Sequence, residues 1–505
     1  GMILLFLAVI WTWRRFYREK AGASVIQRIA KNSIASIALN LFNRLVDFAF
    51  AALMLRILGP ENAGAYYTAG TIFMWFQILA NFGLDAYLTR EISRHRDTPN
   101  RFFVNATVVR LGITAVGVPV LFGFIGLRQT VFPQPTSSQA ITALILLYVG
   151  LFPNAISQGL TSLFYAYEKA EYPAAISTVT TLLKVTLGTV ALLAGWSIIG
   201  LAAVSIASNV VTMIVMVVIV VRRFFRPRWT SDGALRREML TSSWPLMLNN
   251  LLATLFFKID VFLLEAMRGE DIVGLYSVGY KYLEALNIIP AMFTLSGVFP
   301  VLSREAVHDQ EKFRRFYRLG VKILVGIALP AALLTTLAAP EMVLLLGGRQ
   351  YLPGSRIALR LMVWSIPIGW INSLTQYVLI ALDQQRFLTR AFTFGFAFSL
   401  IANLIFIPRY GYQASAVIHL FAELALLIPF TVGVHRQVGA LRWDEMAGKP
   451  LLATVATGAL ILPLYLWMGR GWAIGAALVA YPVIAWRMGV LSQEERATLA
   501  PLFRR

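Results

Sequence analysis

The stretch Gly59-Pro-Glu-Asn-Ala-Gly-Ala-Tyr66 separates two apolar segments, and its Gly, Gly and Tyr return 210 residues later in Gly269-Glu-Asp-Ile-Val-Gly-Leu-Tyr276. The same shift places Asn40 on Asn250, Leu41 on Leu251, Ser93 on Ser303, Arg94 on Arg304 and Phe103 on Phe313. Matches that keep one register across two segments and their loops predict an internal repeat. The alternative is that Gly-x-x-x-x-Gly-x-Tyr marks only a tight turn and an interfacial aromatic residue.

The composition around this repeat is that of a membrane protein. The chain has 505 residues, of which 58% are hydrophobic and only 14% are charged, and its mean hydropathy is +0.68. So few charges do not coat the surface of soluble domains of this total size. The composition therefore excludes a soluble enzyme and predicts a polytopic membrane protein.

Windows of about 20 apolar residues, the length that crosses roughly 30 Å of hydrocarbon, predict about fourteen transmembrane helices. They lie approximately at residues 33–58, 64–88, 103–126, 140–164, 173–194, 198–221, 242–266, 274–299, 319–339, 358–381, 388–407, 411–435, 450–468 and 471–488. Because the repeat contains six helices, an even number, both copies enter the membrane in the same direction. We expect an all-α fold with two parallel six-helix lobes around a central cavity, followed by two C-terminal helices.

The domain organisation follows from these spans. It comprises an interfacial or remnant segment 1–31, an N-terminal lobe 32–221, a cytoplasmic linker 222–241, a C-terminal lobe 242–435, two additional helices within 450–488 and a cytoplasmic tail 489–505. The segment Met2 to Trp13 is apolar but too short to span a bilayer, and it lacks the small-residue cleavage site of a signal peptide.

The net charge of +20 is explained by membrane topology rather than by nucleic acid binding. Most of the 45 Lys and Arg residues fall in loops on the side that holds both termini. The opposite loops hold only Arg128, Arg268, Arg349, Arg356, Arg409 and Arg470. By the positive-inside rule, both termini are predicted to be cytoplasmic, in a multi-pass protein of the cytoplasmic (inner) membrane.

Sequence motifs exclude several classes of enzyme and cofactor. The chain has no cysteine and four scattered histidines, which argues against thiolate chemistry and a catalytic zinc site. It contains no nucleotide-binding glycine motif and no GxSxG. The predicted loops are short, which disfavours a membrane glycosyltransferase or ligase, the alternative of another class. We expect a transporter without a bound cofactor.

Several short motifs, taken in order, resemble the bacterial oligosaccharide flippase family, a Wzx-like branch of the multidrug/oligosaccharidyl-lipid/polysaccharide exporter superfamily. They are Arg56-Ile-Leu-Gly-Pro-Glu-Asn-Ala-Gly-Ala-Tyr66, Phe82-Gly-Leu-Asp85, Thr89-Arg-Glu-Ile-Ser-Arg94, Lys258-Ile-Asp-Val261, Gly274-Leu-Tyr-Ser-Val-Gly-Tyr-Lys281, Phe299-Pro-Val-Leu-Ser-Arg304, Leu346-Gly-Gly-Arg-Gln-Tyr351 and Ile407-Pro-Arg-Tyr-Gly411. The resemblance spans roughly residues 30–435.

The resemblance implies translocation of an undecaprenyl-diphosphate-linked oligosaccharide across the cytoplasmic membrane for polysaccharide or O-antigen assembly. Glycosyltransferases and a polysaccharide polymerase would be its partners. The alternatives within the superfamily are a drug/cation antiporter and a lipid II flippase. The latter family carries an Arg-Asp pair in its first helix, whereas here Arg44 matches and the pair is missing from Asn43-Arg-Leu-Val-Asp-Phe48.

Ionisable residues inside the predicted spans are the candidate functional residues, because each costs about 2.5 to 3.5 kcal/mol to insert and is expected to face a cavity or a partner. The candidates for a cationic cavity that binds the diphosphate are Lys184, Arg44, Lys281, Lys258 and Arg110. The candidates for coupling to Na⁺ or H⁺ are Asp47, Asp260 and Glu423, the last with His419 one turn before it.

Structural roles are the alternative for most of these charges. The pairs Arg44 with Asp47 and Lys281 with Glu284 lie three residues apart on a helix and could neutralise themselves. Lys258 and Asp260 lie on different faces, so each needs a partner from another helix or a ligand. Lys184 has no acidic neighbour within one turn. Arg110, Lys322 and Arg56 could extend to the headgroups by snorkelling.

Overall fold

The computed structural model describes residues 25–294, 309–439 and 443–493, together with residues 299, 302, 304, 305 and 495. Helices account for nearly all of these residues, and none of them lies in a strand. The chain divides into two compact units, and each is described by itself. Unit 1 comprises Gly1–Leu58 and Ala65–Leu251, and unit 2 comprises Gly59–Gly64 and Leu252–Arg505.

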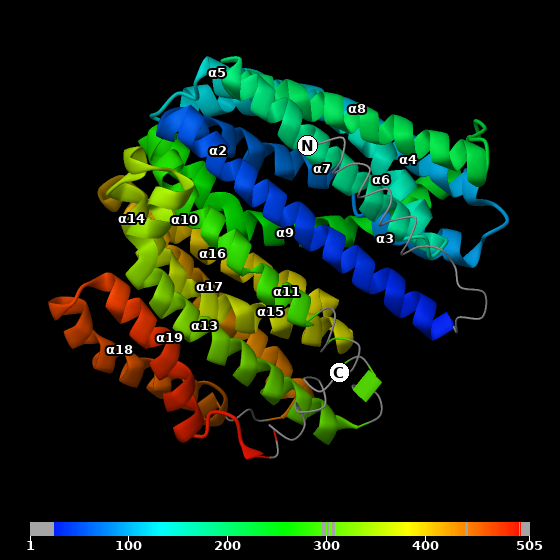
Figure 1. Ribbon diagram of the computed structural model, residues 1–505. Coiled ribbons are helices and arrows are strands. Elements are labelled where there is room, and N and C mark those ends of the chain that lie inside the picture. Colours follow the sequence, from blue (N-terminus) through cyan, green and yellow to red (C-terminus); the bar gives the residue numbers. More distant parts are fainter. Residues whose placement is uncertain are drawn as a thin grey trace. The chain divides into compact units, whose positions relative to one another are not determined.

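Unit 1 consists of long helices that follow one another along the chain in blue, cyan and green (Figure 1). They are α2 (Val25–Asn81), α3 (Leu84–Arg94), α4 (Pro99–Val131), α5 (Ser138–Val149), α6 (Leu151–Ala166), α7 (Glu171–Leu193), α8 (Ser197–Arg223) and the first part of α9 (Gly233–Arg268). Helix α8 packs on α5, α6 and α7, and α6 also contacts α3 and α4. A cluster of buried apolar residues that includes Leu88, Phe103 and Phe164 forms the core at the end of α3, α4 and α6.

Unit 2 contains the rest of α9 and the helices that follow it. They are α10 (Glu270–Leu286), α11 (Ile288–Phe293), α13 (Gln310–Leu346), α14 (Gly354–Met362), α15 (Ile366–Ala381), α16 (Gln385–Tyr410), α17 (Tyr412–Val438), α18 (Lys449–Trp467) and α19 (Arg470–Arg487). Helix α15 packs between α13 and α17, and α16 pairs with α17. The last two helices pair with each other and rest on α13.

The helix boundaries have local physical causes. Pro99 and Pro450 occupy the first turns of α4 and α18, where a missing backbone N–H costs nothing. The Asp309 side chain accepts hydrogen bonds from the N–H groups of Glu311 and Lys312 at the start of α13, and Ser137 caps α5 in a similar way. Such caps satisfy backbone donors that a helix leaves free at its N-terminus.

The predicted loop between the first two spans is only a kink. Gly59 alone is non-helical, with φ 71° and ψ 176°, and Pro60 already belongs to the next helical segment of α2. The repeat-related Gly269 has nearly the same backbone conformation, with φ 95° and ψ 170°. Only glycine adopts this region of φ and ψ readily, which explains why both hairpins carry it.

The second glycine of the repeat serves close packing inside unit 2. A Cβ on Gly64 would collide with the backbone of Glu270 and Gly274, and a Cβ on Gly274 would collide with the backbone of Pro60. Residues 59–64 therefore lie backbone to backbone against the start of α10. The repeat that the sequence shows thus has a structural role at both glycines.

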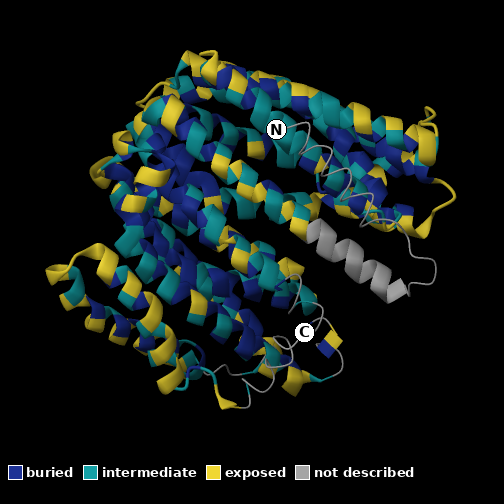
Figure 2. Ribbon diagram, in the orientation of Figure 1, coloured by how far each residue is buried: buried dark blue, intermediate teal, exposed yellow. Residues whose placement is uncertain are grey.

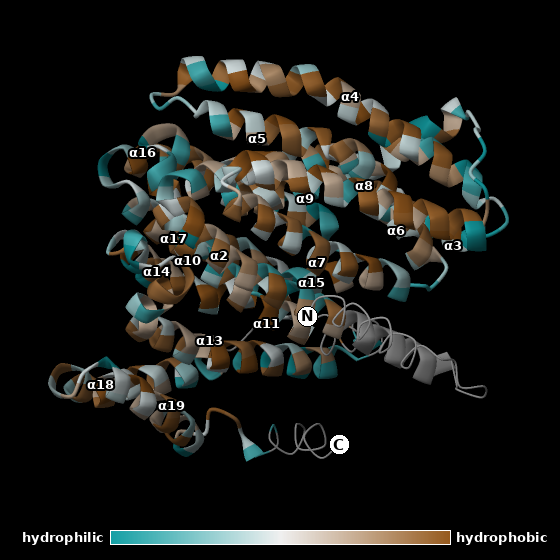
Figure 3. Cartoon of the chain, turned by 45° about the horizontal axis from the view of Figure 1, so that its top comes forward, coloured by the Kyte–Doolittle hydropathy of each residue, from teal (hydrophilic) through white to brown (hydrophobic). Residues whose placement is uncertain are grey.

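The helices carry the surface expected of a multi-pass membrane protein. Ten helical segments of the described residues are long and apolar enough to cross a membrane, and the count of about fourteen stays a prediction. Large apolar side chains lie exposed along them, for example Leu193 at 73%, Val479 at 68% and Trp467 at 89%. Exposed residues recur along many helices in Figure 2, and hydrophobic residues, in brown, dominate most helices in Figure 3. In lipid such a surface is favourable, whereas in water it would aggregate.

Several predicted boundaries differ from those of the helices. The span 140–164 is divided at Gly150 into α5 and α6, and the span 274–299 is divided at Asn287 into α10 and α11. The linker 222–241 is non-helical only over residues 224–232, because α9 begins at Gly233 and continues from unit 1 into unit 2. The six-helix lobes 32–221 and 242–435 stay predictions. The N-terminal segment up to residue 24 and most of the tail 489–505 lie outside the described residues.

Candidate functional site

In unit 1 the most deeply buried charge is Arg110, on α4. Its side chain is fully buried, and its Nη2 group donates hydrogen bonds to Asp85 Oδ1 at 2.6 Å and to Asn81 Oδ1 at 2.9 Å. Ser162 on α6 donates a third hydrogen bond, at 3.1 Å, to the same Asp85 oxygen. The snorkelling alternative for Arg110 is therefore wrong, because an acidic partner on α3 holds the guanidinium inside the helix bundle.

The Arg110 guanidinium also faces a small polar cavity. Its Nε and Nη1 atoms are buried without a hydrogen-bond partner in the part of the chain that the structure describes. Gln77, Asn81, Asn154 and Gln158 line the adjacent space. Asp85 was quoted in the sequence only as part of a motif. It was missed as a partner because it lies 25 residues from Arg110.

The other candidates of unit 1 lie apart from this pair. Arg44 and Asp47 are both exposed on α2, and among the described residues no ion pair joins them. The alternative that these two neutralise each other is therefore wrong. Lys184 is half-buried on α7 and has no ion-pair partner within the described ranges, as the sequence predicted from its surroundings.

In unit 2, Lys258 and Lys281 share one carboxylate. Lys258 Nζ lies 2.6 Å from Glu284 Oε1, and Lys281 Nζ lies 2.8 Å from Glu284 Oε2. The Lys258 ammonium also lies 3.9 Å from the centroid of the Tyr280 ring, a cation–π contact. We call Lys258, Glu284 and Lys281 the lysine triad.

The lysine triad bears out two predictions about pairing. Lys258 on α9 finds its partner on another helix, α10, and Lys281 pairs with Glu284 three residues along the same helix. The prediction that Lys281 and Glu284 simply neutralise each other is incomplete, because the carboxylate serves two ammonium groups. Counted by formal charge, the lysine triad keeps one positive charge.

Asp260 is held by two other helices. The hydroxyl of Tyr276 on α10 donates a hydrogen bond to Asp260 Oδ2 at 2.6 Å. His419 Nδ1, on α17, lies 3.8 Å from the same oxygen. The backbone N–H of Val261 donates to the second oxygen, Oδ1, at 2.8 Å. Asp260 is 3% exposed, so its carboxylate is enclosed by protein groups and needs a local rearrangement to meet a ligand.

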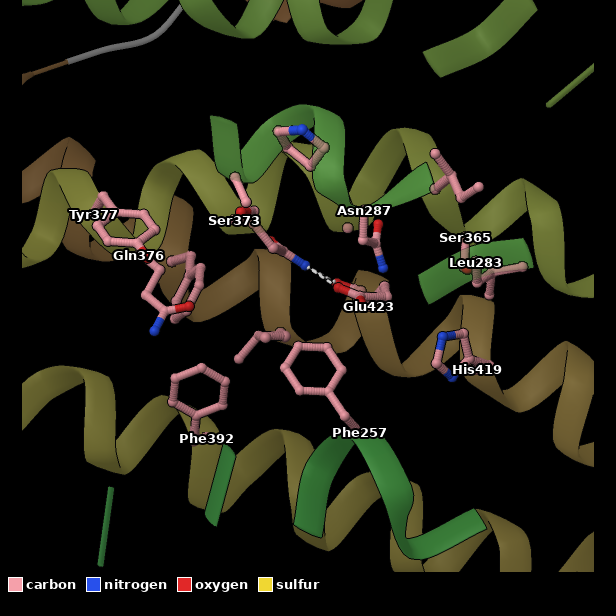
Figure 4. Close-up of a pocket in the computed structure, with 17 residues that line it drawn as sticks. Phe257, Leu283, Asn287, Ser365, Ser373, Gln376, Tyr377, Phe392, His419 and Glu423 are labelled. Atoms are coloured by element: carbon pink, nitrogen blue, oxygen red, sulfur yellow. Dashed lines mark hydrogen bonds between the residues drawn. The ribbon is translucent and has the colours of Figure 1, made fainter. Parts of the chain in front are cut away.

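Glu423 occupies the wall of a cavity of about 220 Å³. Asn372 Nδ2, on α15, donates to Glu423 Oε2 at 2.7 Å and to the Glu423 carbonyl oxygen at 2.8 Å. In Figure 4 the Glu423 side chain projects from α17, with the rings of Phe257 and Phe392 on one side of the cavity and Gln376 and Tyr377 at another. Glu423 is thus the acidic candidate of unit 2 that borders open space.

The structure therefore brings four of the eight candidates into neighbouring positions of unit 2, namely Lys258, Lys281, Asp260 and Glu423. The Tyr280 ring lies between Lys258 and His419: it contacts the Lys258 ammonium, and its centroid lies 5.7 Å from that of the His419 ring. Sequence reasoning missed Asn372, because a neutral amide gives no signal when only charges are searched. Among the described residues, no group of three His, Cys, Asp or Glu side chains is placed to hold a metal ion.

The chain can now be compared with known proteins. Residues 29–305 match the family described as polysaccharide biosynthesis protein, and residues 245–405 match the MatE family. A relative named "Probable flippase AglR", from Haloferax volcanii, is 22% identical over 451 residues, which cover 87% of this chain and 89% of that protein.

Two solved structures share the fold. One is titled "Lipid II flippase MurJ, inward closed conformation" and matches with a TM-score of 0.72 at 11% sequence identity. The match covers 93% of this chain and 100% of the MurJ chain. The other is an inward-facing multidrug resistance MATE family transporter of the MOP superfamily, which matches with a TM-score of 0.64 at 17% sequence identity. That match covers 78% of this chain and 94% of the transporter chain. At these identities the likeness establishes the fold alone.

Proposed function

The chain belongs to the polysaccharide biosynthesis protein family, and from that premise we propose that it translocates an undecaprenyl-diphosphate-linked oligosaccharide across the cytoplasmic membrane. It is a flippase of the multidrug/oligosaccharidyl-lipid/polysaccharide exporter superfamily rather than an enzyme. The nature of its cargo, a sugar carried on a lipid diphosphate, is the part proposed here.

The observation that carries this proposal is the lysine triad. A diphosphate that leaves water loses strong hydration, and fixed cations in a low-dielectric site compensate for that loss. Lys258 is 10% and Lys281 28% exposed by side chain, and both are held by Glu284. A bound diphosphate would compete with one carboxylate for two ammonium groups that are already positioned.

The basic candidates of unit 1 are further proposed contacts for the anionic head of the substrate. Lys184 is half-buried, Arg44 is exposed on α2, and Arg110 keeps two guanidinium nitrogens without a hydrogen-bond partner among the described residues. In the proposed cycle these groups hold the diphosphate and sugar head while the polyprenyl tail stays in lipid. Rocking of residues 32–221 against 242–435 alternates access to the two sides.

Coupling to a sodium or proton gradient is proposed for Asp47, Asp260 and Glu423. Asp260 and Glu423 are buried carboxylates inside the membrane-spanning helices, a placement typical of ion and proton pathways. The proposal places both termini in the cytoplasm of an inner-membrane protein. Glycosyltransferases would supply the substrate, and a polymerase would consume the product.

The first test is complementation. A bacterial strain that lacks its own oligosaccharide flippase receives wild type or Lys184→Ala, with expression checked by immunoblot. We expect the variant to restore much less polymer, because no described carboxylate pairs with Lys184 and so none competes there with a bound diphosphate. Wild-type polymer output from Lys184→Ala would remove Lys184 from the site.

Coupling is tested in proteoliposomes loaded with a fluorescent undecaprenyl-diphosphate sugar. Imposed sodium and proton gradients are varied separately, and the fraction of lipid flipped is measured by quenching from outside. A rate that ignores both gradients would remove the coupling role from all three acidic residues without affecting the translocation itself.

A drug/cation antiporter is the second candidate function. It is favoured by the MatE match over residues 245–405 and by the buried acidic groups Asp260 and Glu423. Such an exporter would protect cells from cationic dyes, which a lipid-linked sugar flippase would not do. Measuring dye efflux in cells that express the protein, beside the complementation assay, separates the two candidates.

A further inference from the structure

The cavity beside Glu423 has one polar and one aromatic side. Its polar groups include Glu423, Asn372, Asn287 and Gln376, and its aromatic groups include Phe257 and Phe392. At about 220 Å³ it is smaller than the roughly 300 Å³ at which sites for drug-sized ligands begin. Its size and its two chemically different sides suit one small ring that has both polar edges and apolar faces.

Two amides at the cavity have hydrogen-bonding capacity left over. Asn372 is 4% exposed, its Nδ2 is engaged by Glu423, and its Oδ1 is buried without a partner in the described part of the chain. Asn287 Oδ1 accepts a hydrogen bond from Trp370 Nε1 at 3.0 Å, which leaves its own NH₂ group to donate. A ligand with neighbouring hydroxyls can donate to Asn372 and accept from Asn287 at the same time.

The residues of the lysine triad do not line this cavity themselves, but their neighbours along α9 and α10 do. Glu284 and Asn287 lie three residues apart at the end of α10 and so share a face, and Lys258 follows the cavity residue Phe257 on α9. The Tyr280 ring contacts the Lys258 ammonium. The centroid of the same ring lies 5.7 Å from that of His419, and His419 lines the cavity. Cations for a diphosphate and a polar, aromatic cavity thus lie next to each other within unit 2.

We propose that this cavity binds the first sugar of the lipid-linked oligosaccharide, the one attached directly to the diphosphate, while Lys258 and Lys281 hold the diphosphate. The hydroxyl edge of the sugar meets Asn372, Asn287 and Glu423, and an apolar C–H face of the ring lies against Phe257 and Phe392. This assignment rests on the proposed function. A bare cation would occupy a small part of the space and leave the aromatic side unused.

The test compares two kinds of lipid. Purified protein in nanodiscs is titrated with undecaprenyl diphosphate, and then with the same lipid carrying a single glucose, galactose, N-acetylglucosamine or N-acetylgalactosamine. The quantity of interest is the ratio of the two dissociation constants. We expect at least one glycosylated lipid to bind wild type roughly tenfold more tightly than the bare diphosphate, the gain of about two hydrogen bonds.

Asn372→Ala removes one of these two hydrogen bonds and should lower the ratio to about threefold or less. It should leave the affinity for the bare lipid within about twofold, because in the proposed site Asn372 meets the sugar and not the diphosphate. Glu423→Gln, which preserves side-chain shape, should lower the ratio as well and stands in if Asn372→Ala folds poorly. Asn403→Ala is the matched control, because Asn403 is a fully buried amide of the same unit that bonds Ser399 and Ser415 away from the cavity. It should keep the wild-type ratio.

The outcomes separate the claims. If wild type binds neither lipid, the proposed substrate class and the sugar site fall together. If it binds both equally, or if the Asn372 and Glu423 variants keep the wild-type ratio, only the sugar site is overturned. A further outcome also overturns the sugar site. If replacing sodium by choline shifts the melting temperature of wild type but not that of Asn372→Ala, and if Asn372→Ala keeps the wild-type ratio of dissociation constants, the cavity is a cation site.

Discussion

Unit 1 and unit 2 treat buried charge in different ways. In unit 1 the Arg110 side chain is fully buried and pairs with the Asp85 carboxylate, which is 40% exposed. Unit 2 joins Lys258, Glu284 and Lys281 into a triad whose sequence neighbours Phe257 and Leu283 line a cavity. The Arg110 guanidinium has no exposed surface and meets a ligand only after a rearrangement, whereas the partly exposed ammonium groups of the triad can exchange their carboxylate for a ligand.

The internal repeat shows that this difference is not imposed by the backbone. Gly59 and Gly269 both have positive φ angles, 71° and 95°, and Tyr66 and Tyr276 match at the repeat offset in sequence. At the same offset, however, Lys258 corresponds to Phe48 and Asp260 to Phe50. The two halves therefore share hairpin geometry and differ in charge, so we expect the recognition of an anionic substrate to be asymmetric and concentrated in unit 2.

The largest effect on stability should come from breaking the ion pair of the buried Arg110 with Asp85. Asp85→Asn leaves the guanidinium of Arg110 without its charged partner inside unit 1, which should cost about 3–5 kcal/mol of unfolding free energy. Thermal melting in detergent measures the loss. The double variant Asp85→Leu with Arg110→Leu should recover part of it, because no unpaired charge remains. If Asp85→Asn alone melts at the wild-type temperature, Asp85 does not stabilise the buried Arg110 guanidinium.

The next largest loss of stability is expected from a substitution at Gly274, the second glycine of the repeat. Gly274→Ala introduces a Cβ where the backbone of Pro60 already lies, so the hairpins must separate at a cost of about 1–3 kcal/mol. Gly326→Ala is the matched control, since a Cβ on that helical glycine meets no atom within 4 Å, and it should be neutral or slightly stabilising. Equal melting temperatures for the two variants would show that the repeat does not serve packing.

Breaking the triad should affect stability less and transport more. Glu284→Gln should lower the unfolding free energy by about 1–2 kcal/mol, because the site is partly open and Lys258 keeps its contact with Tyr280. Glu341→Gln serves as control, since its carboxylate is 54% exposed in a pair with Arg470 and should matter by less than about 1 kcal/mol. If Glu284→Gln destabilises the protein as strongly as Asp85→Asn, the contrast between the two units fails.

The smallest effect concerns Asp232, in the non-helical stretch 224–232 outside the membrane-spanning helices. The backbone N–H of Leu235 and the Arg101 side chain hold the pKa of Asp232 below its ordinary value of 3.8. The stabilisation is therefore present above that value and lost as the pH falls through the lowered pKa. Asp232→Asn should speed amide exchange in residues 229–235 at pH 6. If Asp232→Asn still exchanges faster than wild type at low pH, the ion pair between Asp232 and Arg101 does not hold this stretch.

Sequence reasoning predicted the helices and the pairing of neighbours, because hydropathy and helical spacing are local. It anticipated that Lys281 and Glu284 share a face and that Lys258 needs a partner from another helix. It could not identify Asp85 as the partner of Arg110, since that contact depends on how α3 and α4 pack. It gave no signal for Asn372, whose importance comes only from the cavity around it.

The snorkelling expectation for Lys322 was also wrong. Its side chain is 10% exposed and pairs with Glu495 at 2.9 Å, a residue 173 positions later in the chain. Spacing along one helix carries no information about a partner at such a separation. The same pair supplies a second buried lysine in unit 2 that lies outside the proposed site, which is useful as a control.

The central claim is that the lysines of the triad bind the diphosphate of a lipid-linked sugar. The most direct measurement is the flipping rate of a fluorescent undecaprenyl-diphosphate sugar in proteoliposomes that contain wild type, the double variant Lys258→Gln with Lys281→Gln, or Lys322→Gln. We predict that the double variant loses at least roughly tenfold in rate, equivalent to about 1.4 kcal/mol, while Lys322→Gln stays within about twofold. A folded double variant that flips the lipid at the wild-type rate would contradict the account.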